Sequence, residues 1–356
     1  MRNVFHKLKV VDKSFLTDNA VLLTFAVGED LKDSFAFLSG QYITLKSEIN
    51  NEEVRRSYSI CTSPEENSLS VVVKAIDAGL FSNFIKYKVE VGDYLEVSSP
   101  EGRFVYNISK NSVKNIFLIA AGSGITPIIS IVKNILRNES SSTVTLLFAN
   151  KQIEDVIFYH ELKSLESQFN KRLKVIYIFS RKDYDDHHFG RIDHGFLNNI
   201  IHQELNFTNF SEFYTCGPEE MVKNIHKYLL SIGISRDIIK SELFYSLDNK
   251  ICIEKIIAED IKSKQTKVEV IIDQESHHLT INQTKNLLES LLDEGLDVPY
   301  SCKKGNCSSC VGKVISGTVN MKETDILMDY EIEEGFILCC QSVPTSEELI
   351  ISYDEY

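Results

Sequence analysis

The chain has 356 residues, of which 43% are hydrophobic and 25% are charged, and its formal net charge is −13. This length and balance predict a soluble globular protein of two or three domains, and the acidity argues against nucleic acid as a partner. The longest uncharged apolar stretch, Ile116–Val132, is too short and too interrupted by Gly, Ser, Thr and Pro to cross a bilayer, so we expect no membrane insertion. Met1–Asp12 lacks an apolar signal-peptide core, and we therefore expect a cytoplasmic protein.

Residues 1–107 alternate short β-type segments with turns. Short strands at this spacing predict an antiparallel β-barrel as the first domain. The expected strands are Val21–Val27, Gln41–Leu45, Tyr58–Ile60, Leu69–Lys74 and Asp93–Val97.

One segment of the predicted barrel, Arg55–Ile60, carries side chains suited to an aromatic cofactor with a pyrophosphate. Arg56 offers a fork of donors for a pyrophosphate, and Tyr58 offers a flat ring that stacks on an aromatic cofactor. Ser59 offers a hydroxyl for a heteroatom on the edge of the cofactor. An ordinary alternating strand would explain the same residues.

A second segment of the predicted barrel, Gly79–Ser82, opens a helix expected at Ser82–Tyr87. Backbone amides at a helix start bind phosphate, and Ser82 is expected to cap this helix. The alternative is a turn glycine followed by a plain helix cap.

Residues 108–240 change to buried-type strands that alternate with amphipathic helical stretches. This alternation predicts βα units on a parallel sheet, and hence an α/β domain. The expected strands are Ile116–Ala121, Val144–Phe148, Val175–Phe179 and Phe213–Cys216, and the expected helices are Ile128–Arg137, Asp155–Phe169 and Glu219–Leu230.

A glycine-rich segment, Ile119–Pro127, lies between a predicted strand and a predicted helix. It departs from the G-x-G-x-x-G fingerprint, because a proline follows Thr126 where a third glycine is expected nearby. Gly122 and Gly124 nevertheless allow close approach of a ligand to the backbone, and Pro127 suits a first helical turn.

Ser180 and Arg181 follow another predicted strand of the α/β domain, and Arg191 lies a little further on. A 2′-phosphate is recognised by a hydroxyl and cations at such a strand end. We therefore expect the bound nucleotide to be NADPH rather than NADH. The alternative is that Arg181 is simply a solvated surface arginine.

Residues 241–263 are predicted to form a charged linker, and residues 264–356 a third domain with strands Val268–Ile272 and His278–Ile281 and a helix Thr284–Glu294. This last segment holds 7 Lys against 17 Asp or Glu. Such a surface would suit a basic redox partner, and a plain solvated surface is the alternative.

Five cysteines lie in the third domain. Cys302, Cys307 and Cys310 have the C-x4-C-x2-C spacing of a plant-type [2Fe-2S] ferredoxin, whose fourth thiolate comes from further along the chain. The separation from Cys310 favours Cys340 over Cys339, which we expect to be a small buried residue. A zinc site and a disulfide framework are the alternatives, but zinc sites usually pair two C-x2-C knuckles, and disulfides fit a cytoplasmic chain poorly.

These motifs occur in an order that resembles the ferredoxin–NADP reductase superfamily with a C-terminal plant-type [2Fe-2S] ferredoxin domain. The resemblance rests on Arg56–Ser59, Ile119–Pro127, the C-G-P segment Cys216–Pro218 and Gly335–Cys340. It extends over nearly the whole chain to the reductases of bacterial oxygenases, such as phenylacetyl-CoA epoxidase in phenylacetate catabolism. It implies a FAD-binding barrel, an NAD(P)-binding α/β domain and an α+β ferredoxin domain of β-grasp type.

The resemblance also implies roles for individual residues. Tyr58, Ser59 and Cys216 would act at the reacting rings, and Val73 and Lys74 would contact FAD mainly through their backbone. The implied FAD contacts are Arg56, Ser57, Tyr58, Ser59, Val73, Lys74, Gly79, Leu80, Phe81 and Ser82. The implied nicotinamide contacts are Gly122, Ser123, Gly124, Thr126, Ser180, Arg181, Cys216, Gly217 and Pro218. The implied cluster ligands are Cys302, Cys307, Cys310 and Cys340.

We therefore predict an NAD(P)H:acceptor oxidoreductase that passes electrons through FAD and a [2Fe-2S] cluster to an oxygenase. A flavin suits this task because it takes two electrons as hydride and releases them singly. The alternatives are a different acceptor, such as a desaturase or a hybrid-cluster protein, and a non-catalytic metal-binding or redox-sensing module. The acceptor and the oligomeric state are left open by the sequence.

Overall fold

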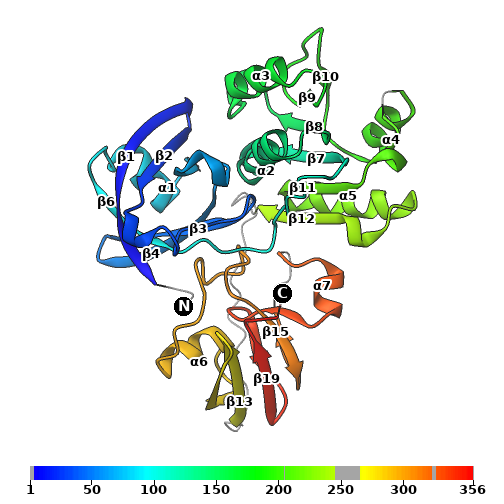
Figure 1. Ribbon diagram of the computed structural model, residues 1–356. Coiled ribbons are helices and arrows are strands. Elements are labelled where there is room, and N and C mark those ends of the chain that lie inside the picture. Colours follow the sequence, from blue (N-terminus) through cyan, green and yellow to red (C-terminus); the bar gives the residue numbers. More distant parts are fainter. Residues whose placement is uncertain (1–3, 204, 245–264, 323–325, 356) are drawn as a thin grey trace. The chain divides into compact units, whose positions relative to one another are not determined.

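The computed structural model describes residues 4–203, 205–244, 265–322 and 326–355 (Figure 1). The chain divides into two compact units, residues 5–243 and a second unit made chiefly of residues 244–356. Residues 245–263 of the expected linker lie outside the described residues, whereas residues 241–244 belong to a strand. In the described ranges, no helix has the length and apolar character needed to span a membrane.

The first unit begins with a six-stranded antiparallel sheet in the order β4-β3-β6-β1-β2-β5. A bridge between Ile60 and Val71 pairs the two ends of this order, so the sheet closes into the predicted barrel. Apolar side chains such as Leu23 and Val73 fill its interior, and Phe81 of the single helix joins them. The elements are β1 (Phe5–Thr17), β2 (Ala20–Ala26), β3 (Tyr42–Ile49), β4 (Glu52–Ser59), β5 (Leu69–Lys74), β6 (Tyr94–Ser98) and α1 (Leu80–Tyr87).

The second part of this unit is a six-stranded sheet in the order β10-β9-β8-β7-β11-β12. Strands β7 to β11 pair in parallel, as the alternation of strands and helices predicts. Helices α2 and α3 lie together on one side of the sheet, and α4 and α5 on the other (Figure 1). The strands are β7 (Asn115–Ala121), β8 (Thr143–Asn150), β9 (Leu173–Phe179), β10 (His188–Phe189), β11 (Glu212–Pro218) and β12 (Ile239–Phe244). The helices are α2 (Ile125–Asn138), α3 (Tyr159–Gln168), α4 (His194–Gln203) and α5 (Glu219–Ser231).

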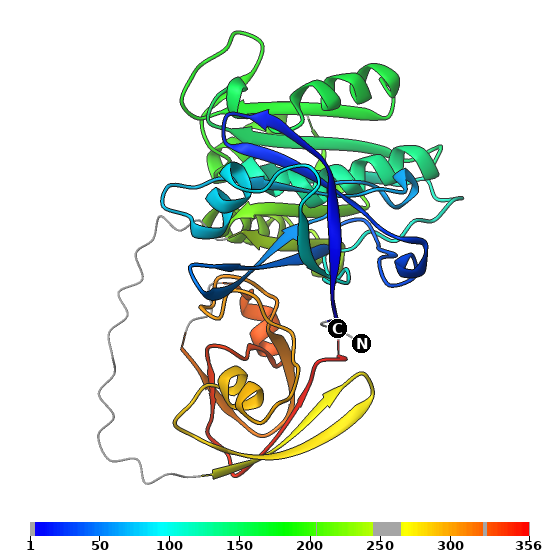
Figure 2. The same ribbon diagram turned by 90° about the vertical axis from the view of Figure 1, so that its left-hand side faces the viewer.

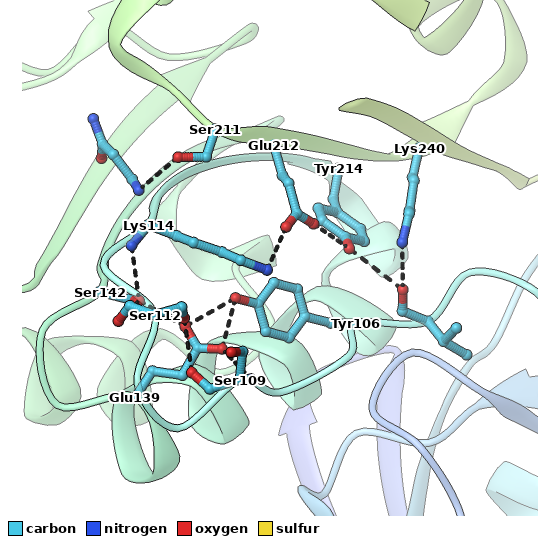
Figure 3. A network of polar contacts seen from close by, with 12 residues as sticks. Tyr106, Ser109, Ser112, Lys114, Glu139, Ser142, Ser211, Glu212, Tyr214 and Lys240 are labelled. Atoms are coloured by element: carbon cyan, nitrogen blue, oxygen red, sulfur yellow. Dashed lines mark hydrogen bonds and ion pairs between the residues drawn. The ribbon is translucent and has the colours of Figure 1, made fainter. Parts of the chain in front are cut away.

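A buried polar network holds the segment that leads from the barrel to the parallel sheet (Figure 3). Glu139, at the end of α2, has no exposed surface. The Tyr106 hydroxyl donates to both of its carboxylate oxygens at 3.0 Å, the Ser109 amide donates at 2.9 Å and the Ser142 hydroxyl at 2.6 Å. Since Tyr106 and Ser109 lie in that segment, the carboxylate ties it to the α/β domain.

The second unit contains a five-stranded mixed sheet in the order β14-β13-β19-β15-β17. Strand β13 pairs antiparallel with β14 and parallel with β19, and the yellow helix α6 lies against this sheet (Figure 2). Leu287, Leu288 and Leu291 of α6 are buried. This is the predicted α+β arrangement. The elements are β13 (Gln265–Ile272), β14 (Glu275–Asn282), α6 (Leu287–Asp293), β15 (Val311–Ser316), β16 (Val319–Met321), α7 (Asp329–Glu333), β17 (Phe336–Leu338), β18 (Ser342–Pro344) and β19 (Glu348–Ser352).

Candidate cofactor sites

The predicted flavin residues Arg56, Ser57, Tyr58 and Ser59 occupy the last four positions of β4, paired with β3. Tyr58 is half-buried, and its ring lies 6.3 Å from that of Phe81 on α1, with 29° between the two planes. Burial raises the pKa of the Tyr58 hydroxyl well above its usual range, so this group stays neutral. The Arg56 guanidinium donates to the Arg55 carbonyl at 2.6 Å. The strand therefore holds a cation and a neutral aromatic ring two residues apart.

The expected role of Ser82 as a helix cap is wrong. Helix α1 begins at Leu80 behind Gly79, and no side chain caps it. The Ser82 hydroxyl instead closes the preceding turn, accepting from the Ile76 amide at 3.4 Å and donating to the Gly79 carbonyl at 3.5 Å. A Cβ on Gly79 would lie 2.5 Å from this hydroxyl, so a side chain at position 79 would displace Ser82.

The glycine-rich loop lies at the carboxyl end of β7, where Gly122–Gly124 form a single 3-10 turn before α2. The Thr126 hydroxyl donates to the Ser123 carbonyl at 3.0 Å and fixes this turn. The Lys74 amine of the barrel lies 3.8 Å from where a Cβ on Gly122 would be. Burial lowers the pKa of Lys74. The resemblance implied a mainly backbone contact with FAD for Lys74, and its side-chain cation beside the loop was missed.

Gly124 brings the two predicted nicotinamide segments together. A Cβ at this position would lie 2.2 Å from the Cys216 carbonyl oxygen and 2.9 Å from the Gly217 nitrogen, closer than real Cβ contacts come. The parallel pairing of β7 with β11 sets Cys216 beside Ala120 and so aligns the two strand ends. The loop and the C-G-P segment thus meet backbone to backbone, and any side chain at 124 would separate them.

Cys216 is fully buried, and its thiol lies 3.8 Å from a carboxylate oxygen of Glu242 on β12. Burial raises the pKa of Glu242 to about 8, although the Cys216 thiol and the Arg103 charge oppose this shift. Burial and Glu242 together raise the pKa of the thiol as well. Both groups are therefore chiefly neutral at pH 7. Glu242 was missed because it lies in the charged segment that was expected to be a linker.

Ser180 and Arg181 directly follow β9, at the carboxyl edge of the parallel sheet. Their amides donate to the carbonyls of Asn150 and Lys151, each at 3.0 Å, which fixes the backbone after the strand. The Arg181 side chain is exposed. Gly190 donates to the Phe179 carbonyl at 2.8 Å, which places the neighbouring Arg191 near the same strand end.

The predicted cluster ligands form two pairs in the second unit. The Cys302 and Cys307 sulfurs are 3.2 Å apart, and the Cys310 and Cys340 thiols are hydrogen-bonded to each other. Two cysteine pairs match the two irons of a [2Fe-2S] cluster, each of which binds two thiolates. Among the described residues, no three His, Cys, Asp or Glu side chains gather into a site for a single metal ion.

Cys339 points away from this set into the core of the domain. Its thiol is hydrogen-bonded to Tyr353 and lies 3.3 Å from where a Cβ on Gly312 would be. Its amide donates to the Cys310 carbonyl at 3.1 Å, and its carbonyl accepts from Leu288 at 3.1 Å. The backbone is thus held on both sides, which supports the choice of Cys340 as the fourth ligand.

Three family models match consecutive parts of the chain. They describe an oxidoreductase FAD-binding domain at residues 7–106, an oxidoreductase NAD-binding domain at 118–227 and a 2Fe-2S iron-sulfur cluster binding domain at 270–345. The solved structure of a phthalate dioxygenase reductase, described as modular for electron transfer from pyridine nucleotides to [2Fe-2S], covers 98% of both chains with a TM-score of 0.59 at 22% identity.

Curated relatives match the chain over almost its full length. One subunit of the 1,2-phenylacetyl-CoA epoxidase from Escherichia coli strain K12 is 33% identical over 352 residues, which cover 98% of each chain. The ferredoxin reductase component of 3-ketosteroid-9-alpha-monooxygenase from Rhodococcus rhodochrous is 32% identical over 93% of this chain and 92% of its own. The glycine betaine monooxygenase reductase subunit of Chromohalobacter salexigens is 26% identical over 92% and 90%.

Proposed function

We propose specific tasks for the residues of this chain, which belongs to the family of oxygenase reductases built from FAD-binding, NAD-binding and [2Fe-2S] domains. As such a reductase, it transfers electrons from a nicotinamide to an oxygenase. Bound FAD supplies the conversion of a two-electron hydride donor into single electrons for the cluster. The proposed domains are residues 1–107, 108–240 and 264–356, with β12 extending the second of them to Phe244 and so shortening the proposed linker to residues 245–263. The proposed location is the cytoplasm.

The junction of Gly124 with Cys216 is the observation that carries the proposal for the nicotinamide. We assign the carboxyl edge of β7 and β11 to this ring, which Cys216 would contact while Glu242 contacts the thiol. Because both groups are chiefly neutral at pH 7, they present a thiol and a carboxyl group without a formal negative charge. The Lys74 cation beside Gly122 would hold a phosphate of the same nucleotide.

The end of β4 would hold FAD, with the Tyr58 ring stacked on the flavin and the Arg56 guanidinium on its pyrophosphate. Gly79–Ser82 would face the same pyrophosphate through backbone amides. Val73 would act through its backbone, since its side chain is buried in the barrel. Phe81 supports Tyr58 from inside the barrel, and this contact explains the orientation of the Tyr58 ring.

Tyr58→Ala is expected to weaken FAD binding roughly two- to tenfold, because aromatic stacking contributes about 0.5–1.5 kcal/mol beyond the buried area. Arg56→Ala is expected to weaken it about tenfold to a hundredfold, since a hydrogen bond to a charged group contributes about 1.5–3 kcal/mol. FAD titration of the apoprotein, followed by flavin fluorescence, measures both changes. Tyr58→Phe keeps the ring and should retain FAD. Wild-type affinity in both alanine variants would contradict the assignment.

We also propose that Ser180 and Arg181 bind the 2′-phosphate of NADPH. Arg181→Ala should then raise KM for NADPH about tenfold and leave KM for NADH unchanged, because one charge-assisted hydrogen bond is lost. Steady-state rates with each nucleotide test this. Lys182→Ala is the matched control, since it removes an adjacent cation whose amine lies 5.0 Å from the Tyr184 ring centre. A clear NADH preference, unaffected by Arg181→Ala, would refute the proposed phosphate site.

The acceptor we propose is an oxygenase of the phenylacetyl-CoA epoxidase type, because the relative bearing that name matches 98% of both chains. The competing candidate is a 3-ketosteroid oxygenase, because the reductase component of that name matches 93% of this chain. Each oxygenase component would be purified and mixed with the reduced chain, and hydroxylated or epoxidised product per nicotinamide oxidised would be measured. We expect coupled product with the epoxidase. Coupling only with the steroid oxygenase, or with neither, would reject this acceptor.

A further inference from the structure

The residue after the proposed fourth ligand, Gln341, directs its side chain at the cluster site. Its Nε2 donates a hydrogen bond to the Cys340 sulfur at 3.5 Å. Its backbone is fixed at both ends, since its amide donates to the Leu338 carbonyl at 2.9 Å and its carbonyl accepts from Lys322 at 3.0 Å. With the main chain held in this way, the side chain has few alternative positions.

The cluster loop is shaped to accommodate this side chain. Gly305 has a φ of +73°, and a Cβ on it would lie 2.9 Å from Cγ and 3.1 Å from Cδ of Gln341. The Gln341 amide thus lies against the bare backbone of Gly305, between the loop and Cys340. The Gly305 amide also donates to the Cys340 sulfur. Two N–H groups, one from a side chain and one from the backbone, therefore meet at one ligand.

Hydrogen bonds to cluster sulfurs stabilise the reduced cluster more than the oxidised one, because the reduced cluster carries one more negative charge. Backbone donors, such as the Lys304 and Asn306 amides at 3.4 and 3.2 Å from the Cys302 sulfur, exert this effect through the fold of the loop. Gln341 exerts it through a side chain, so its contribution can be changed without altering the loop.

We propose that Gln341 raises the reduction potential of the [2Fe-2S] cluster by donating a hydrogen bond to Cys340. The residue thereby controls how strongly the cluster takes up an electron from the flavin and how readily it passes that electron to the oxygenase. This inference rests on the proposed ligand role of Cys340. Gln341 would thus act on the cluster through the Cys340 sulfur, and it would take no direct part in hydride transfer.

The test is a redox titration of the holoprotein, followed by the electron-spin signal of the reduced cluster. Gln341→Leu should shift the ratio of reduced to oxidised cluster about tenfold toward oxidised at a given potential, which corresponds to about 59 mV for one electron. Gln341→Glu should shift it further in the same direction, because a carboxylate replaces the donor. Gln283→Leu is the matched control, since the Gln283 amide donates to the Thr266 hydroxyl at 3.0 Å instead of to a sulfur.

Potentials that fall in the order wild type, Gln341→Leu, Gln341→Glu, with Gln283→Leu unchanged, would support the proposal. Equal potentials in all four proteins, each with a full cluster, would overturn it and leave the reductase function intact. If the leucine variant fails to assemble a cluster, Gln341→Asn decides, because its shorter amide withdraws the donor but keeps the polarity. An unchanged reduction potential in Gln341→Asn would also overturn the proposal. A cluster that survives Cys340→Ser would instead show that the ligand assignment fails.

Discussion

Cys340→Ser is expected to yield a protein that retains FAD and lacks nearly all of its cluster iron, whereas Cys339→Ser keeps both. The reason is the direction of the two side chains. The Cys340 thiol lies with Cys310, and the Cys339 thiol lies in the core against Tyr353. Iron and acid-labile sulfide content, the visible spectrum and the electron-spin signal of the reduced protein would measure the loss.

Hydride uptake provides an internal control for this prediction. Reduction of ferricyanide by NAD(P)H needs only the flavin part, so its rate should be close to wild type in both cysteine variants. Electron delivery to the oxygenase should fail in Cys340→Ser alone. Cluster loss in Cys339→Ser with retention in Cys340→Ser would show that the other member of the pair is the ligand. A colourless, zinc-rich wild-type protein would reject the cluster itself.

Regular elements with a strong apolar pattern could be predicted from the sequence. Leu69–Lys74 and Ile116–Ala121 were placed within a residue of the observed strands, because continuous apolar runs between turn residues leave few alternatives. Strand β1 was missed although it has 13 residues. Its buried Leu8 and Val10 alternate with lysines, and the density of charge concealed the period-two pattern.

The candidate sites likewise contain residues that sequence motifs predict and residues that only the fold brings to the site. The motifs pointed to the glycine-rich loop and the C-G-P segment separately, but only the structure shows that a Cβ on Gly124 would collide with Cys216. Lys74 and Glu242 take their places through contacts far apart in the sequence. A lysine at a strand end and a glutamate in a charged segment have no local pattern that separates them from solvated surface residues. Their positions depend on the barrel and on β12, which form only when the whole unit folds.

Glu139→Ala is expected to cost the larger unit about 3 kcal/mol or more, because the buried Tyr106 and Ser142 hydroxyls and the Ser109 amide lose their acceptor together. In a unit of this size, each kcal/mol of lost stability lowers the melting temperature by about 2–4 °C, so we expect a decrease of roughly 6–12 °C. The rise in flavin fluorescence as FAD is released on heating would measure it. Tyr106→Phe removes a single donor from the same carboxylate and should cost less, about 1.5 kcal/mol, the lower end of the range for a hydrogen bond to a charged group. Equal melting temperatures for wild type and Glu139→Ala would show that the network in Figure 3 does not stabilise the fold.

The contribution of the Glu139 charge should also depend on pH. Burial opposes ionisation, but hydrogen bonds from the Ser109 amide, the Ser142 and Ser112 side chains and the Tyr106 hydroxyl outweigh it, so the pKa of Glu139 lies below its usual range. A carboxyl group with a lowered pKa stabilises the fold at pH values above its unfolded pKa, about 4.3, and loses this effect as the pH falls further. Glu139→Gln keeps the shape without the charge. Its melting temperature should therefore lie furthest below wild type near pH 7, and the two should converge below about pH 4. A difference that stays constant from pH 7 down to about pH 2, well below the unfolded pKa of about 4.3, would mean that the carboxylate charge contributes nothing, and that the shape of the side chain alone holds the segment between the barrel and the sheet.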